Sequence, residues 1–155
     1  MSAYHTPNDS TLRSSAPKRL SQVYPRRGVK RILIVDDDSS VLNFLQRALA
    51  GYLVVVARDP HEALHAATTL RSLDLLITDY LMPSMTGDEL VARMREQRPG
   101  LTVLILTAHG DILDAEGQAW WANETHLGKP LEVRQLRETV AQLIGPPEST
   151  SSTTA

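Results

Sequence analysis

The sequence of 155 residues contains no cysteine. This absence excludes disulfide bonds, thiolate zinc sites and cysteine nucleophiles together. Aromatic residues make up only 5% of the chain, so aliphatic side chains must fill most of any core. The longest apolar runs, such as Leu53 to Ala57, are far too short to cross a bilayer. The first residues are polar and interrupted by Pro7, without the apolar segment of a secretion signal, so we expect a cytoplasmic protein.

Charge is distributed unevenly along the chain, although the formal net charge is only −2. Residues 1–31 hold seven basic side chains and one acidic side chain, a net charge of +6. The other 124 residues hold nine basic and 17 acidic side chains, a net charge of −8. The basic segment is suited to nucleic acid, lipid headgroups or an acidic partner. Its composition is more typical of a solvated tail that keeps the protein soluble.

Composition divides the chain into three parts. Residues 1–28 are rich in Ser, Thr, Pro and Arg and are predicted to form a disordered basic tail. Residues 145–155 begin with Gly-Pro-Pro, continue in Ser and Thr, and predict a second disordered tail. Residues 29–144 lie between the two tails and carry the apolar patterns of a single folded domain.

Short apolar runs alternate with helical patterns through this domain. The runs predict strands near residues 32–35, 53–57, 75–77, 103–106 and 126–128. We expect Ser39 or Ser40 to cap the first helix and Gly51 to end it, and Asp59 to cap the second. A fourth helix is expected within 109–126, although two glycines weaken its pattern.

Five strands that alternate with five helices imply an α/β fold. Such chains form a doubly wound parallel sheet with helices on both faces, joined by right-handed crossovers. Ligands of these sheets bind beyond the carboxyl ends of the strands. Polar side chains follow four of the five predicted strands: Asp36, Asp37 and Asp38 after the first, Asp79 after the third, Thr107 after the fourth and Lys129 after the fifth.

These residue types suit phosphoryl transfer. Clustered carboxylates stay ionised when a hard cation binds among them, and ligation by oxygen alone favours Mg²⁺. A metal beside Asp79 can bind phosphoryl oxygens, and a carboxylate can act as a nucleophile that forms an acyl phosphate. Lys129 and Thr107 can then hold the remaining phosphoryl oxygens.

The same residues stand in motifs that resemble the full signature of response-regulator receiver domains of two-component systems. The motifs are Val35-Asp36-Asp37, Asp79-Tyr80-Leu81-Met82-Pro83 with Gly87, Thr107-Ala108, and Lys129-Pro130. The similarity spans residues 31–144, and each motif stands at its expected strand end. The resemblance implies a flavodoxin-like sheet of order 2-1-3-4-5, in a receiver of the stand-alone type.

The resemblance also implies the metal and phosphate ligands. Asp79 would be the phosphoacceptor. Asp37 would bind Mg²⁺ (or Mn²⁺) directly, Asp36 would bind it through water, and Leu81 would offer its backbone carbonyl. Lys129 would contact the phosphoryl group, and the proline after it would follow a cis peptide bond.

Two positions would report phosphorylation to the surface. Thr107 matches the switch hydroxyl that bonds the phosphoryl group. His126 stands three residues before Lys129, where the family usually has Tyr or Phe. An imidazole there is either a working switch or a passive replacement of the aromatic ring.

Further departures concern the lifetime of the phosphate and the fourth helix. The side chains that would tune hydrolysis are Leu81 and His109, two residues beyond Asp79 and Thr107. Because Leu81 cannot accept a hydrogen bond from water and can shield the site, we predict a long-lived phosphate. His109 could still orient a water and would act in the opposite direction. Trp121-Ala122-Asn123 stands where the family usually has small residues, and Trp121, with Trp120 beside it, would be either an exposed partner anchor or repacked core.

The implied function is phosphorelay signal transduction without turnover of external substrates. A sensor histidine kinase or phosphotransfer protein would phosphorylate Asp79, and a downstream protein would bind the face of helix four, strand five and helix five. Eleven residues follow Ile144, so we expect no DNA-binding domain in this chain. Homodimer formation stays open.

Two alternatives remain open at this level. Asp36-x-Asp38 after a strand resembles the nucleophile motif of haloacid-dehalogenase-type phosphatases, with Asp36 as nucleophile and Asp38 as general acid. That hypothesis leaves the motif after Asp79 unexplained, and the chain shows no cap domain. The second alternative is a degenerate receiver that binds partners without phosphorylation, but the full acidic set and Lys129 are present.

Overall fold

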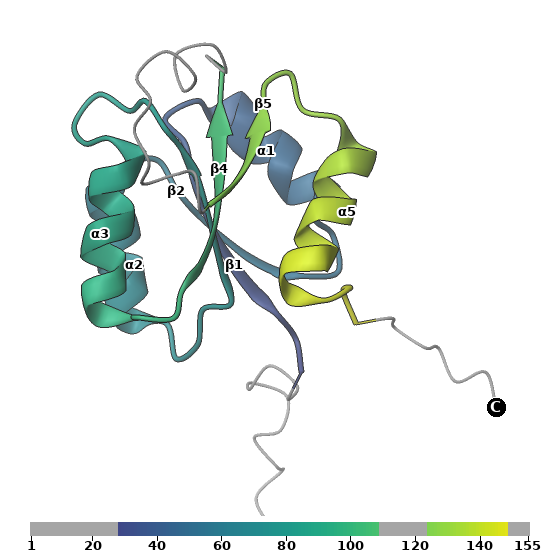
Figure 1. The fold of residues 1–155 in the computed structure, drawn as a ribbon, viewed down its shortest axis with the longest axis horizontal. Coiled ribbons are helices and arrows are strands. Elements are labelled where there is room, and N and C mark those ends of the chain that lie inside the picture. Colours follow the sequence, from purple (N-terminus) through teal and green to yellow (C-terminus); the bar gives the residue numbers. More distant parts are fainter. Residues whose placement is uncertain (1–27, 109–123, 149–155) are drawn as a thin grey trace, which may run out of the picture.

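The computed structural model describes residues 28–108 and 124–148 (Figure 1). Several expectations lie outside these residues. They are the tail up to residue 27, the fourth helix over residues 109–123, the last residues of the second tail, and the side chains of His109, Trp120 and Trp121.

Five parallel strands form one sheet in the order β2-β1-β3-β4-β5. This order confirms the predicted flavodoxin-like topology. The strands are β1 (Arg31–Val35), β2 (Leu53–Ala57), β3 (Leu75–Asp79), β4 (Thr102–Thr107) and β5 (Thr125–Gly128). Four described helices accompany them: α1 (Ser39–Ala48), α2 (Pro60–Thr69), α3 (Gly87–Gln97) and α5 (Val133–Ile144).

The helices cover both faces of the sheet, with α2 and α3 on one side and α1 and α5 on the other (Figure 1). Side chains of β1 alternate between the two resulting cores, since successive strand residues point to opposite faces. Leu33 and Val35 pack with the buried residues of α2 and α3. Ile32 and Ile34 pack with those of α1 and α5. The central strands β1, β3 and β4 are thus buried on both faces, as their continuous apolar runs predict, whereas the edge strands β2 and β5 are partly exposed.

The start of α1 differs from the sequence prediction. Asp38, rather than Ser39 or Ser40, is the N-cap, because its carboxylate accepts hydrogen bonds from the Ser40 amide at 2.9 Å and the Ser40 hydroxyl at 2.6 Å. A carboxylate at this place also interacts favourably with the positive end of the helix dipole. The helix ends at Ala48, two residues earlier than the predicted boundary, and Gly51 follows in the turn with φ of 102°.

The start of α2 matches its prediction. Asp59 caps α2 by accepting from the Glu62 amide at 2.9 Å, and Glu62 in turn accepts from the Arg58 amide at 2.9 Å. This reciprocal pair resembles a capping box, except that Glu62 accepts from the amide of Arg58 and not from that of the N-cap residue Asp59. The α3 helix ends at Gln97, two residues before Pro99, which cannot continue a helix.

The end of α5 is tied to the amino edge of the sheet. The Tyr52 hydroxyl donates to the carbonyl of Gly145 at 2.8 Å, and Arg137 donates to the carbonyl of Ala48 at 2.9 Å. Residues 145–148, which composition assigned to a tail, therefore begin with a fixed hydrogen bond. Within the described ranges, no helix is long and apolar enough to span a membrane.

Candidate functional site: an acidic cluster at the carboxyl edge of the sheet

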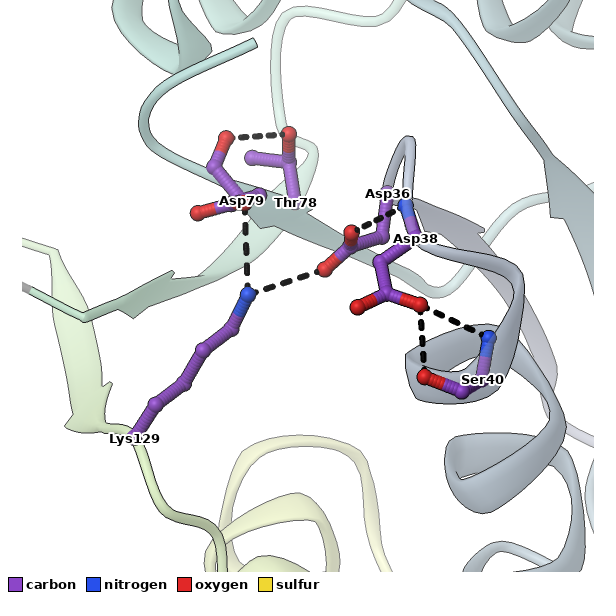
Figure 2. A network of polar contacts seen from close by, with 6 residues as sticks. All are labelled: Asp36, Asp38, Ser40, Thr78, Asp79 and Lys129. Carbon is purple, nitrogen blue, oxygen red and sulfur yellow. Dashed lines mark hydrogen bonds and ion pairs between the residues drawn. The ribbon is translucent and has the colours of Figure 1, made fainter.

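Sheet order brings residues from three parts of the chain to one edge. β1 and β3 are neighbours with Val35 opposite Thr78, so Asp36 and Asp79 follow at the same level. Lys129 follows β5 and reaches back toward them from the far side of β4 (Figure 2). The carboxyl ends of parallel strands lie along one edge, which is why residues more than 90 positions apart can meet there.

One ammonium group lies between two carboxylates. Lys129 Nζ donates to Asp36 Oδ2 at 3.0 Å and to Asp79 Oδ2 at 3.2 Å (Figure 2). The Asp36 side chain is only 1% exposed and that of Asp79 13% exposed, so solvent screens these contacts little. The sequence predicted that these three side chains converge, but not that a single lysine contacts both acids.

Burial and neighbouring charges shift the pKa values of Asp79 and Lys129. Burial raises the pKa of Asp79, and the nearby negative charge of Asp36 raises it further, while Lys129 opposes both effects. Burial by itself would lower the pKa of Lys129, but the hydrogen bond with Asp36 and the charge of Asp79 outweigh it and raise that pKa. One positive charge is thus shared by two acids, and it does not fully offset the effects of burial and of Asp36 on the pKa of Asp79.

A third carboxylate completes a candidate metal site. Oxygen atoms of Asp36, Asp37 and Asp79 all lie within 4.8 Å of one another. Among the described residues, this is the one group of three or more acidic or histidine side chains close enough to share an ion. The donor set is oxygen only and partly open to solvent, which fits Mg²⁺ or Mn²⁺ with several retained waters. The residues therefore fit the divalent metal that the sequence predicts.

Asp38 is turned away from this cluster. Its side chain points to Ser40 at the start of α1 (Figure 2), and those hydrogen bonds lower its pKa. A general acid must hold a proton near the reacting group, and a carboxylate stabilised in its charged form as a helix cap is unsuited to that task. The structure thus gives Asp38 a structural role and leaves the phosphatase hypothesis without its acid.

The two predicted switch residues, Thr107 and His126, lie on β4 and β5. Thr107 is 3% exposed, and its carbonyl accepts from the Lys129 amide at 2.8 Å. The peptide bond between Lys129 and Pro130 is cis, as the resemblance implied. His126 lies on β5 opposite Ile105 with an exposed side chain. Its role as a switch stays a prediction.

The loop after β3 closes tightly beside Asp79. Tyr80 donates its amide to Leu106 at 3.0 Å and accepts from the Gly87 amide at 2.7 Å. Met82 and Met85 are buried beneath this loop, whereas Leu81 is 48% exposed. The sequence identifies Gly87 only as part of the motif. In the structure a side chain there would collide with the backbone of Asp79.

The site and fold define a doubly wound α/β protein with an acidic cluster and a lysine at the carboxyl edge of its sheet. The family model for the response regulator receiver domain matches residues 32–141. The chain therefore belongs to the response regulator receiver domain family, whose members act in two-component phosphorelay signal transduction. No comparison supports the phosphatase alternative.

Curated relatives include transcriptional regulators. The chain is 32% identical over 117 residues to the alkaline phosphatase synthesis transcriptional regulatory protein PhoP of Bacillus subtilis, a match that covers 74% of this chain and 48% of that protein. It is 40% identical over 114 residues to the DNA-binding transcriptional regulator NtrC of Klebsiella pneumoniae, covering 72% and 24% respectively. The chain thus spans half or less of the length of these relatives.

Solved structures agree at the level of the single domain. A receiver domain protein from Clostridium thermocellum matches with a TM-score of 0.67 and 29% identity, over 75% of this chain and 94% of that one. The response regulator TrrA from Thermotoga maritima, solved in complex with Mg²⁺ and BeF, matches with a TM-score of 0.65 and 30% identity, over 74% and 99%.

Proposed function

We propose that Asp79 accepts a phosphoryl group and that Asp36 and Asp37 hold a divalent metal beside it. The observation that carries this proposal is the position of Lys129, whose ammonium lies within hydrogen-bond distance of both Asp36 and Asp79. A phosphoryl group on Asp79 would bring its oxygens into this reach. The TrrA structure, which holds Mg²⁺ and BeF, supports the choice of Mg²⁺ as the metal.

In the proposed reaction, a carboxylate oxygen of Asp79 attacks the phosphorus of the donor. The new oxygen–phosphorus bond forms as the bond from phosphorus to the donor's leaving atom breaks, and a leaving imidazole keeps that electron pair. A bound divalent metal supplies neutralisation of charge on the phosphoryl oxygens. Lys129 shifts its contacts from the two carboxylates to those oxygens, so its ammonium supports the charge that develops in transfer.

A surface groove beside the acceptor suits the protein that delivers the phosphoryl group. One hollow of about 360 Å³ is lined by Ser40, Val41, Phe44, Lys129, Pro130 and Leu131. A neighbouring hollow shares Ser40 and Phe44 with it and continues to Arg47 and Val133. The groove is mostly apolar, and one of its walls is Lys129, which contacts Asp79. We assign it to a histidine kinase or phosphotransfer protein, because a donor seated there lies next to the acceptor.

Output would leave through the surface that contains β5 and α5, together with the expected fourth helix. Thr107 connects the site to β5 because its carbonyl binds the amide of Lys129. When its hydroxyl bonds the phosphoryl group, the end of β4 is displaced together with β5, and His126 on β5 changes its exposure. A downstream protein that binds β5 and α5 would detect this change.

The test is phosphorylation with acetyl phosphate, followed by intact mass with and without Mg²⁺. The wild type should gain one phosphoryl group per chain only when Mg²⁺ is present. Asp79→Asn should gain none, and Asp37→Asn should be phosphorylated much more slowly. Phosphorylation of Asp79→Asn at the wild-type rate would refute the proposal.

Asp38→Asn is the matched control for loss of a carboxylate near the site. Asp38 caps α1 and points away from Asp79, so this variant should be phosphorylated like the wild type. The protein should also show no continuous release of phosphate beyond decay of its own acyl phosphate. Sustained turnover that disappears in Asp36→Asn and Asp38→Asn would instead indicate a phosphatase.

A further inference from the structure

Helix α2 carries a second group of metal-ligating side chains, on elements that the acidic cluster does not use. Residues 61–65 read His-Glu-Ala-Leu-His, so His61 and His65 stand four positions apart near the start of α2. Residues at this spacing lie above one another on one helix face, with Cβ atoms about 5–6 Å apart. Two imidazoles at this separation can bind one metal ion as a pair.

The sequence pattern also occurs in zinc metalloproteases, where two histidines bind zinc and the glutamate between them is the general base. That chemistry does not fit here. Glu62 is engaged at the helix start, since its Oε2 accepts from the Arg58 amide at 2.9 Å. Among described residues, no third acidic or histidine side chain joins the two histidines in a metal-binding group. A catalytic zinc site needs three protein ligands, so α2 lacks the means for hydrolysis.

The two imidazoles themselves are free to bind. Both side chains are exposed, whereas Ala63 and Ala67 on the opposite face of α2 are buried. Within residues 28–108 and 124–148, neither imidazole makes a hydrogen bond or an ion pair. A metal ion would therefore displace only water from them and would disturb no contact of the fold.

The charge around the start of α2 also permits a cation. A helix N-terminus repels cations, at a cost of about 0.3–1 kcal/mol in exposed positions. Here the carboxylates of Asp59 and Glu62 stand on the first turn and oppose this repulsion.

We propose that His61 and His65 form a surface site for one borderline transition-metal cation, such as Cu²⁺, Ni²⁺ or Zn²⁺, with water at the remaining positions. Imidazole nitrogen selects these ions, and Mg²⁺, which prefers oxygen, should not compete. The site is independent of the proposed phosphorylation, because α2 contributes no residue to the acidic cluster.

The experiment is titration of the chain, free of any affinity tag, with NiCl₂ in excess Mg²⁺, which occupies the acidic cluster. One Ni²⁺ should bind per chain. Replacing either histidine, by His61→Ala or His65→Ala, should weaken binding on the order of tenfold, because each leaves one imidazole and abolishes the chelate. The double variant that lacks both His61 and His65 should bind Ni²⁺ no more tightly than a double variant that lacks His126 and one of these two histidines.

His126→Ala is the matched control. His126 is an exposed histidine on β5, at the opposite edge of the sheet from the β2 strand that precedes α2, so its loss should leave Ni²⁺ affinity unchanged. Amide signals should broaden around α2 on addition of substoichiometric Cu²⁺. Equal affinity of the wild type and the His61→Ala, His65→Ala double variant would overturn the proposal. A loss of affinity in His5→Ala or His109→Ala, with broadening away from α2, would overturn it equally.

Discussion

A Cβ atom on Gly87 would lie 2.8 Å from the carbonyl oxygen of Asp79 and 3.1 Å from the Cα atom of Tyr80. Both neighbours are backbone atoms that cannot rotate away. The loop after β3 therefore returns onto the acceptor residue, and a side chain at the start of α3 would push that residue out of place.

Gly87→Ala should destabilise the protein by about 1–3 kcal/mol through overpacking. Helix propensity alone predicts the opposite, since alanine is favoured over glycine in a helix by up to about 1 kcal/mol. Urea unfolding measures the difference. Gly100→Ala is the control, because nothing lies within 4 Å of a Cβ atom there. Equal free energies of unfolding for the two variants would show that the close approach at Gly87 does not affect stability.

Lys129→Met should destabilise the metal-free protein by about 1–3 kcal/mol, because it leaves two largely buried carboxylates without their counter-charge. Mg²⁺ should recover much of this loss, since it binds the folded state through the same carboxylates. Thermal unfolding with and without Mg²⁺ measures both effects. The Arg134→Met control breaks a pair with Glu138 that is exposed to solvent and should change stability by less than about 0.5 kcal/mol.

Asp79→Asn should make the metal-free protein more stable at pH 7. Burial and Asp36 raise the pKa of Asp79 above its ordinary value of 3.8. Below 3.8 both the folded and unfolded states hold the proton, so the carboxyl affects stability little. As pH rises from there through the raised folded pKa, the unfolded state gives up its proton more readily, and stability is lost.

The side-chain amide that replaces the Asp79 carboxyl in that variant carries no charge and escapes this loss. The advantage of the variant in the free energy of unfolding should therefore be present at pH 7 and shrink as pH falls toward 3.8. Urea titrations of both proteins at several pH values in EDTA test this. An Asp79→Asn variant that is less stable at pH 7 would contradict the predicted direction.

Leu81→Asn should shorten the lifetime of the phosphoryl group on Asp79. Leu81 is 48% exposed beside the acceptor and offers water no hydrogen bond. One hydrogen bond to an attacking water is worth about 1 kcal/mol, so an amide there should speed hydrolysis roughly fivefold. The decay of phosphorylated protein after donor removal is the measurement. Leu81→Met keeps an apolar side chain and should decay like the wild type; equal decay of all three proteins would exclude a role for Leu81.

The sequence by itself determined the buried strands and the chemistry of the site. Apolar runs at 32–35 and 75–77 required strands buried on both faces, and parallel strands must place Asp36 and Asp79 at the same edge. Side-chain spacing along a strand and the handedness of crossovers are local constraints, so they can be inferred from the order of residues alone.

The tertiary structure decided which of these side chains meet and which do not. Three consecutive aspartates look alike in sequence, yet Asp36 is buried against Lys129 while Asp38 caps α1. Distances between residues far apart in the chain separate the two roles. Gly87 is a second case. The carbonyl oxygen of Asp79 excludes a side chain at position 87, and only the folded loop brings that oxygen into contact with Gly87.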